Sequence, residues 1–390
     1  MDIIYLYCIF VFYALAVISM AFFWPFIKIH RNKLSGEPET TFSIIIPARN
    51  EAQNILACLN SVLGQDYPPD LFQVIVVDDH SDDETFQIAE TFRQKFAGKG
   101  VKFEVTKPFN NIPGKKGAIA TGIQKAGNDW IVTTDADTIR DKQWLKVFDD
   151  LIRRKNPVLI SAPVRFTTSG SLFQRWQALE FASLNAIGAI SMWLGFPNIC
   201  NGANLAYKKS AYKASGGFEG YENIASGDDE LLLHKMHKNF PGRLSFLKDK
   251  RAIVQTDAPG NILDFIKQRS RWASKGRYYK GGASALPGLF VWMVNFLVVS
   301  LIFAAFMGGI GWSSLLIAWS VKAFAEFVFL LMVAPFYGGG RNWYLFWLFQ
   351  PFYPFYVVIA GLLGTVGNFS WKGRQVKNGK LALPKKDING

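Results

Sequence analysis

The longest apolar runs of the chain lie near its two ends. The first covers about residues 3–27, and three more follow at about 287–309, 312–335 and 343–367. Each run is long enough to cross a bilayer whose hydrocarbon core is roughly 30 Å thick. We therefore expect an N-terminal transmembrane anchor over residues 1–28 and a C-terminal hydrophobic region of about three segments over residues 286–367.

The middle of the chain has a different pattern. Short apolar runs of strand length occur at Phe42–Ile46, Val74–Val77, Trp130–Thr134 and Val158–Ala162. Helical stretches alternate with them, at Ala52–Leu63, Asp83–Phe96, Gly117–Ala126 and Lys142–Arg154. Strands that alternate with helices predict an α/β domain with a mostly parallel sheet covered on both faces. We place this domain at residues 40–260.

Charged residues beside the apolar runs indicate the orientation. Lys28, Arg31 and Lys33 follow the first run, so the positive-inside rule places the α/β domain in the cytoplasm. Three further crossings would then put the C-terminus outside, whereas the basic tail, residues 368–390, favours the inside. Pro351 and Pro354 interrupt the last run, so a re-entrant, split or interfacial last segment stays open.

Two charged residues lie inside the third apolar run. Lys322 and Glu326 are four positions apart, so on a helix they share one face and can pair. Pairing makes both charges tolerable in lipid. A structural pair is the simpler interpretation, and a lipid or substrate path is the alternative.

The charge balance points to anionic partners. The chain has 43 basic and 30 acidic residues, a formal net charge of +13. Many of the basic residues cluster beside the apolar runs, which favours a membrane surface over nucleic acid. Three cysteines without a CxxC spacing exclude a zinc ribbon and a disulfide scaffold and suit a reducing compartment.

Acidic residues follow two of the predicted strands. Asp78 and Asp79 end one strand, and Asp135 and Asp137 follow another as Asp-Ala-Asp. Ligands of open parallel sheets bind at the carboxyl ends of the strands, and carboxylates suit Mg²⁺ or Mn²⁺. Acids that cap turns or helices are the alternative explanation.

Two further motifs carry charge at predicted helix starts. Lys115 lies in Gly114-Lys115-Lys116-Gly117, and a helix N-terminus preceded by Gly and Lys is a natural phosphate site. Asp228 and Asp229 lie in Ser226-Gly227-Asp228-Asp229-Glu230, which suits either a general base or a helix cap. A solvated basic turn is the alternative for the first motif.

Residues 261–284 predict an amphipathic helix on the membrane surface. Gln268, Arg271 and Trp272 are spaced i, i+3 and i+4, so they share one helix face. Arginine can neutralise a leaving diphosphate, and tryptophan can stack on a sugar or a base. A plain interfacial anchor is the alternative.

In this order, these motifs resemble those of membrane-bound family 2 glycosyltransferases with a GT-A catalytic domain. The resemblance covers about residues 41–275 and begins with Ser43-Ile44-Ile45-Ile46-Pro47-Ala48-Arg49-Asn50-Glu51. It implies a first nucleotide-binding loop with Pro47, Arg49 and Glu51, where Glu51 approaches the ribose. Asp79 would contact the base, commonly uracil in this family.

The resemblance also implies roles for the remaining motifs. Lys115 would support the diphosphate, Asp135 would be the nucleotide-side acid, and Asp137 would bind the metal, Mg²⁺ or Mn²⁺. Asp229 would be the general base, with Asp228 as the other candidate. Gln268, Arg271 and Trp272 would line the acceptor and diphosphate end of the site.

The implied reaction is an inverting transfer from a nucleotide-sugar, most simply a UDP-sugar, to a lipid or lipid-linked acceptor at the cytoplasmic membrane face. Processive polysaccharide synthases share these motifs, but they typically have more crossings than this chain offers. Three alternatives therefore remain: a processive synthase, a nucleotidyltransferase on a similar domain, and a non-catalytic membrane protein that binds nucleotide. A Trp371-Lys372-Gly373-Arg374 sequence also resembles members that act on membrane lipids.

Overall fold

A computed structural model describes residues 3–30, 36–167, 169–279, 285–366, 369–377 and 379–381. The chain divides into two compact units. The α/β unit comprises Lys28–Arg165, Ser191–Asp257 and Phe369–Gly390, and the helical unit comprises Met1–Ile27, Phe166–Ile190 and Ala258–Asn368. Of the basic residues noted above, Arg31 and Lys33 lie outside the described residues, as does the tail beyond Leu381.

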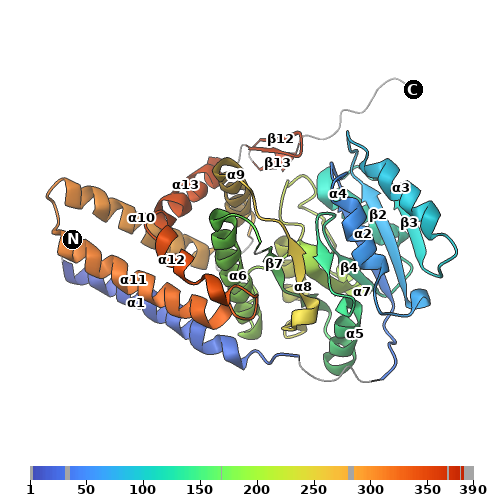
Figure 1. Ribbon diagram of the computed structural model, residues 1–390, viewed down its shortest axis with the longest axis horizontal. Coiled ribbons are helices and arrows are strands. Elements are labelled where there is room, and N and C mark those ends of the chain that lie inside the picture. Colours follow the sequence, from blue (N-terminus) through green and yellow to red (C-terminus); the bar gives the residue numbers. More distant parts are fainter. Residues whose placement is uncertain are drawn as a thin grey trace. The chain divides into compact units, whose positions relative to one another are not determined.

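A seven-stranded sheet forms the centre of the α/β unit (Figure 1). Its strand order is β3 (Lys102–Thr106), β2 (Phe72–Asp78), β1 (Phe42–Ala48), β4 (Trp130–Thr133), β8 (Leu205–Lys208), β6 (Leu159–Ser161) and β9 (Leu244–Phe246). The pairs β3–β2, β2–β1, β1–β4 and β6–β9 are parallel, and β8 is antiparallel to both of its neighbours. The prediction of a mostly parallel sheet is confirmed.

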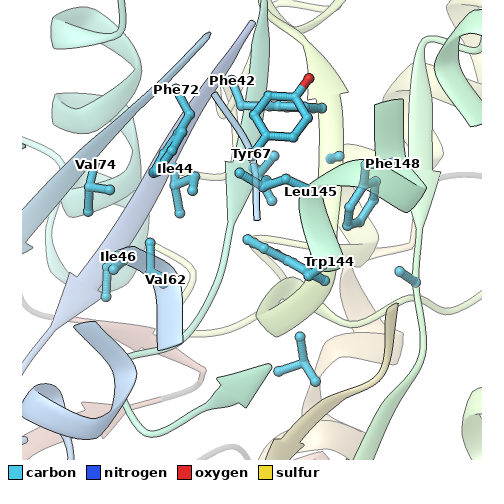
Figure 2. Packing of buried hydrophobic residues seen from close by; sticks show 14 of the residues in the cluster. Phe42, Ile44, Ile46, Val62, Tyr67, Phe72, Val74, Trp144, Leu145 and Phe148 are labelled. Atoms are coloured by element: carbon cyan, nitrogen blue, oxygen red, sulfur yellow. The ribbon is translucent and has the colours of Figure 1, made fainter. Parts of the chain in front are cut away.

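Side chains of the central strands point alternately to two apolar layers, as the pleat requires. Ile44 and Ile46 of β1 lie in one layer, which Figure 2 shows with Val62, Trp144 and Phe148 from the covering helices. Ile45 lies in the other layer. Both faces of the strand are fully buried, which explains its continuous apolar sequence.

Helices cover both faces of this sheet. On the Ile44 side pack α2 (Ile55–Leu63), α3 (Thr85–Phe96) and α5 (Trp144–Lys155). On the Ile45 side pack α4 (Gly114–Lys125), α7 (Lys209–Ala214) and α8 (Glu230–Asn239). The helices predicted around residues 52–63, 83–96, 117–126 and 142–154 correspond to α2, α3, α4 and α5.

Two small sheets contain the remaining strands of the described part of the chain. One has the order β5 (Ile139–Arg140), β10 (Val254–Thr256) and β7 (Val164–Phe166). The other is antiparallel and is formed by β11 (Phe369–Trp371), β12 (Arg374–Lys377) and β13 (Lys380–Leu381). The sequence analysis missed the second sheet, because it interpreted this basic segment as a membrane-facing tail.

The helical unit contains three helices long and apolar enough to cross a membrane, counted among the described residues. They are α1 (Ile3–Phe23), α10 (Leu286–Phe306) and α11 (Trp312–Val333). The fourth apolar run is divided into α12 (Tyr344–Phe349) and α13 (Tyr353–Val366). The break lies where Pro351 and Pro354 predicted it. Two further helices are α6 (Leu172–Trp193) and α9 (Ile262–Ala273).

The predicted pair inside the third apolar run is present. The Lys322 ammonium lies 2.7 Å from Glu326, and the Lys322 side chain is fully buried. Tyr13 of α1 and Gln350 also donate hydrogen bonds to Glu326, at 2.6 and 2.8 Å. The carboxylate therefore joins α11 to α1 and to the end of α12, which favours the structural interpretation.

Candidate active site

Lys115 is the centre of a charge cluster in the α/β unit. It is the second residue of α4, and its ammonium lies 2.6 Å from Asp135 and 3.2 Å from Asp228. Burial alone would lower the pKa of Lys115, but the charges of Asp135, Asp228 and Asp229 outweigh that effect and raise it. Lys115 is therefore a permanent cation held among acids from two other segments.

The neighbouring lysine has a structural role. Lys116 is buried, and its ammonium donates hydrogen bonds of 2.6 Å to the carbonyl oxygens of Ile224 and Ser226. These bonds fix the start of α4 against the loop that leads to Asp228. Lys116 thus positions the acidic loop beside Lys115.

Asp229 caps helix α8. One of its carboxylate oxygens accepts a 2.7 Å hydrogen bond from the Glu230 backbone N–H. The other accepts a 3.1 Å bond from the backbone N–H of Gly202. A Cβ at Gly202 would lie 2.9 Å from a carboxylate oxygen of Asp228, so a larger residue there would displace this acidic side chain. The cap and the general-base interpretations are compatible, because a carboxylate oxygen can accept more than one hydrogen bond.

Asp135 and Asp137 follow β4 and lie on the sheet edge where the parallel strands end. Thr256 donates a 3.2 Å hydrogen bond to Asp137. Burial, and next the negative charges of Asp135 and Glu51, raise the pKa of Asp137 to about 6. The positive charge of Lys372 partly offsets this effect.

This crowding of negative charge fits a divalent cation, which would reverse the effect on the Asp137 pKa. Among the residues that the structure describes, no group of three or more His, Cys, Asp or Glu side chains forms a ligand set. Asp135 and Asp137 could still hold Mg²⁺ or Mn²⁺, because these ions keep open positions for phosphate oxygens.

Arg49 organises the first loop. It lies beyond β1, in which Pro47 pairs with Val77 of β2. The Arg49 guanidinium donates to the backbone oxygens of Asp79 and His80 and reaches the Asp82 carboxylate at 3.1 Å. Arg49 therefore holds the two strand-end loops together, a role that its sequence position did not reveal.

Glu51 and Asp79 meet two cations that the sequence analysis did not place. Lys372 pairs with Glu51, and Arg374 pairs with Asp79. Both acids are buried, with side chains 7% and 5% exposed. Sequence reasoning grouped Lys372 and Arg374 with membrane-facing lysines. The Trp371-Lys372-Gly373-Arg374 sequence was the one signal that could have found them.

The remaining motif lies on α9 in the helical unit. Arg269, between Gln268 and Arg271, is buried and pairs with Glu180. It also donates a 2.5 Å hydrogen bond to the Gln268 side chain and lies 4.4 Å from the centre of the Trp272 ring. Arg269 thus fixes the side chains of Gln268 and Trp272, and sequence reasoning missed this role.

Known proteins resemble this chain over much of its length. The family model described as "Glycosyl transferase family 2" matches residues 43–216, and "Glycosyl transferase family group 2" matches residues 130–359, more than half of the chain. A poly-beta-1,6-N-acetyl-D-glucosamine synthase of Staphylococcus epidermidis is 28% identical over 65% of this chain and 58% of its own length. A poly(ribitol-phosphate) beta-N-acetylglucosaminyltransferase of Staphylococcus aureus is 36% identical over 56% of this chain and 36% of its own.

The chain spans somewhat more than half the length of the first of these relatives. A solved structure has a similar fold: a mannosyltransferase from Pyrobaculum calidifontis in complex with GDP-Man and Mn²⁺. It aligns with a TM-score of 0.55 at 17% identity, over 92% of this chain and 96% of that one. From the family matches and the fold, we conclude that the chain belongs to the family 2 glycosyltransferases and has a GT-A fold.

Proposed function

We propose that this glycosyltransferase is an inverting, metal-dependent enzyme that transfers a sugar from a nucleotide-sugar to a lipid or lipid-linked acceptor at the cytoplasmic membrane face. A UDP-sugar is the donor that we expect. The observation that carries the proposal is the Lys115 cluster, in which one lysine meets Asp135 at 2.6 Å and Asp228 at 3.2 Å. Lys115, which we propose binds the diphosphate, thus contacts Asp135, a proposed metal ligand, and Asp228, the second candidate for the base.

In this proposal the chain's own residues move one proton. The acceptor hydroxyl loses its proton to Asp229 as its oxygen bonds to the anomeric carbon. The bond from that carbon to the diphosphate oxygen breaks, and the nucleoside diphosphate leaves with the electron pair. The fixed cation of Lys115 stabilises the charge that develops on the diphosphate. Asp228, paired with Lys115, is the second candidate for the base.

The other residues of the α/β unit would bind the donor. Glu51 would accept from the ribose hydroxyls and Asp79 from the base, while Pro47 and Arg49 shape the loop between them. Asp137, with Asp135, would hold the metal ion. When bound, Mg²⁺ or Mn²⁺ would offset the negative charge of the diphosphate.

The acceptor assignment depends on the helical unit. It has three helices long and apolar enough to cross a membrane, among the residues described. Gln268, Arg271 and Trp272 belong to the same unit, and we retain for them the roles that the resemblance implies, in binding the acceptor and the diphosphate. An acceptor that is itself lipid-bound suits a catalytic chain with so much apolar helix surface.

A processive polysaccharide synthase is the second candidate. The specific observation in its favour is that two of the relatives are named poly-beta-1,6-N-acetyl-D-glucosamine synthases. Both candidates use the same donor chemistry and differ in the product. A synthase returns the product to the acceptor position, whereas the single-transfer enzyme releases a lipid with one sugar.

The product therefore tests the acceptor assignment. Detergent-purified protein is incubated with isotope-labelled UDP-N-acetylglucosamine, UDP-glucose or GDP-mannose, Mn²⁺ and a total-lipid extract, and the label is followed by solvent partition and mass spectrometry. We expect label in the organic phase, as a lipid one sugar heavier. Label in a long water-soluble chain, formed without lipid, would instead identify a polysaccharide synthase.

A further inference from the structure

The C-terminal hairpin places a lysine at a tight turn. Strands β11 and β12 pair Trp371 with Arg374, so only Lys372 and Gly373 form the turn. Both have positive φ, 46° and 78°, as a type I′ turn requires. Glycine adopts this conformation freely, whereas lysine is strained in it. The backbone of Lys372 is held in place by Arg49, which donates a 3.0 Å hydrogen bond to its carbonyl oxygen.

The side chains at this turn occupy the acids proposed for the nucleoside. Arg374 donates to both carboxylate oxygens of Asp79, at 2.5 and 2.9 Å, and also to the Asp79 carbonyl, at 3.1 Å. Lys372 donates to one oxygen of Glu51, and Asn54 donates to the other at 2.7 Å. Every carboxylate oxygen of Glu51 and Asp79 therefore already accepts a hydrogen bond.

The end of the same hairpin is fixed near the proposed phosphate site. Leu381 donates its backbone N–H to the Asn223 carbonyl, and Gly379 accepts from the Ala225 N–H, both at 2.9 Å. The Leu381 side chain packs so close to Gly114 that an added Cβ there would lie 2.6 Å from it. Gly114 is the first residue of α4 and directly precedes Lys115. The hairpin thus contacts both the nucleoside end and the phosphate end of the proposed donor site.

We propose that the C-terminal hairpin is an autoinhibitory latch, in which Lys372 and Arg374 compete with the donor nucleotide for Glu51 and Asp79. The inference rests on the proposed nucleotide roles of these two acids. The ribose hydroxyls and the base N–H groups need the same carboxylate oxygens that the two cations hold. In this latch the nucleotide displaces the side chains of Lys372 and Arg374 from the two acids when it binds, so its apparent affinity falls by the fraction of molecules in which the latch is open.

Removing the two cations should strengthen nucleotide binding if the hairpin is an inhibitory latch. It should weaken nucleotide binding if Lys372 and Arg374 bind the donor directly. In full-length protein in detergent, Lys372→Gln combined with Arg374→Gln removes both cations and keeps polar side chains. Affinities for UDP and GDP are measured by calorimetry with Mn²⁺ present. Lys377→Gln is the matched control, because Lys377 is an exposed lysine of the same strand as Arg374.

The latch predicts that the double variant binds UDP or GDP at least about tenfold more tightly than the parent protein. Without the two cations, the closed state no longer lowers the apparent affinity. The control should bind like the parent. Weaker binding by the double variant would overturn the proposal and make both residues donor ligands, and an unchanged affinity would make the hairpin a passive cover. If neither parent nor variant binds any nucleotide, the proposed function fails and the latch fails with it.

A second experiment uses the unmodified protein, so its result does not depend on whether the double variant folds. Saturating nucleotide with Mn²⁺ should speed hydrogen–deuterium exchange of the backbone amides in Arg374–Lys377 at least severalfold, because opening exposes the strand. Slower exchange on nucleotide binding would show that the hairpin closes over the donor, which contradicts a latch.

Discussion

The guanidinium of Arg374 contacts both carboxylate oxygens of Asp79, at 2.5 and 2.9 Å, across 295 positions of the chain. This bidentate pair ties the segment after the last apolar helix to the edge of the central sheet. Asp79 directly follows β2, and its side chain is only 5% exposed. A charge-assisted bidentate contact of this kind is among the stronger polar interactions in proteins. It makes the C-terminal hairpin part of the α/β unit.

Replacing Lys115 should strongly slow transfer while the fold is kept. Lys115→Met removes the cation beside Asp135 and Asp228, so we expect a loss of roughly 10²–10³ in kcat, the usual effect of removing one group that stabilises developing charge. Nucleotide release from a UDP-sugar measures it.

Lys116→Met is the comparison variant. It leaves the carbonyls of Ile224 and Ser226 without their buried donor, which costs about 1–3 kcal/mol of unfolding free energy for each group. Thermal unfolding should therefore separate the two variants, with Lys116→Met the less stable. Equal activity in the parent and Lys115→Met would refute the diphosphate role of Lys115.

Replacing the proposed base should uncouple binding from chemistry. Asp229→Asn keeps an oxygen that can accept from the Glu230 N–H, so helix α8 stays capped, but it cannot take the acceptor proton. We expect unchanged nucleotide affinity and at least a hundredfold loss of transfer. Asp228→Asn is tested beside it. Normal transfer by Asp229→Asn, together with loss in Asp228→Asn, would move the base to Asp228.

Asp137 is expected to carry the metal dependence. Asp137→Ala should remove the Mn²⁺-dependent part of UDP binding measured by calorimetry, because Asp135 alone is a weak site for a hard cation. Asp66→Asn, which alters a surface pair with Lys146, is the control for loss of one carboxylate. If Asp137→Ala binds UDP with the same response to Mn²⁺ as the parent, the metal assignment is wrong.

A buried lysine away from the site gives a pH-dependent test of the fold. Lys248 is 3% exposed, and burial lowers its pKa to about 8. The charged form is therefore disfavoured in the folded state. The resulting penalty is present in full below pH 8 and disappears as the pH rises through the unfolded pKa near 10.5.

Lys248→Met should accordingly raise the melting temperature at pH 7, by at most the equivalent of about 3 kcal/mol. The gain should shrink at pH 9.5. Tryptophan fluorescence during heating follows the unfolding. A gain that is the same at both pH values, or a loss at pH 7, would show that burial does not disfavour the charged form of Lys248 in the folded protein.

Much of the fold follows from the hydrophobic pattern, because strands buried on both faces have continuous apolar sequences. The strands around Ile44, Val76 and Ile131 were found in this way. Helix α6 was missed, since it has no acidic residue in its first turn and no basic residue in its last turn. Strand β8 was missed because its sequence, Leu-Ala-Tyr-Lys, has no β-branched residue, whereas β4, a strand of the same length that was predicted, has three.

The candidate site was predictable where it depends on the ends of strands. Parallel strands bring Asp79 and Asp135 to one sheet edge, and that could be inferred from the sequence. The contact of Lys115 with Asp228 depends on long-range packing through Lys116, which no local pattern encodes. The same holds for Arg374, because a basic residue after an apolar helix has the same local sequence whether it meets a lipid or a carboxylate.

The most direct test of the central claim is nucleotide release by the detergent-purified protein. UDP-, GDP- and dTDP-sugars are supplied with Mn²⁺ or Mg²⁺ and a total-lipid extract, and the Asp229→Asn variant is assayed in parallel. The account predicts release from one donor, most simply a UDP-sugar, that requires the divalent metal, the lipid extract and Asp229. Release that persists undiminished in Asp229→Asn, or without any divalent metal, would contradict it.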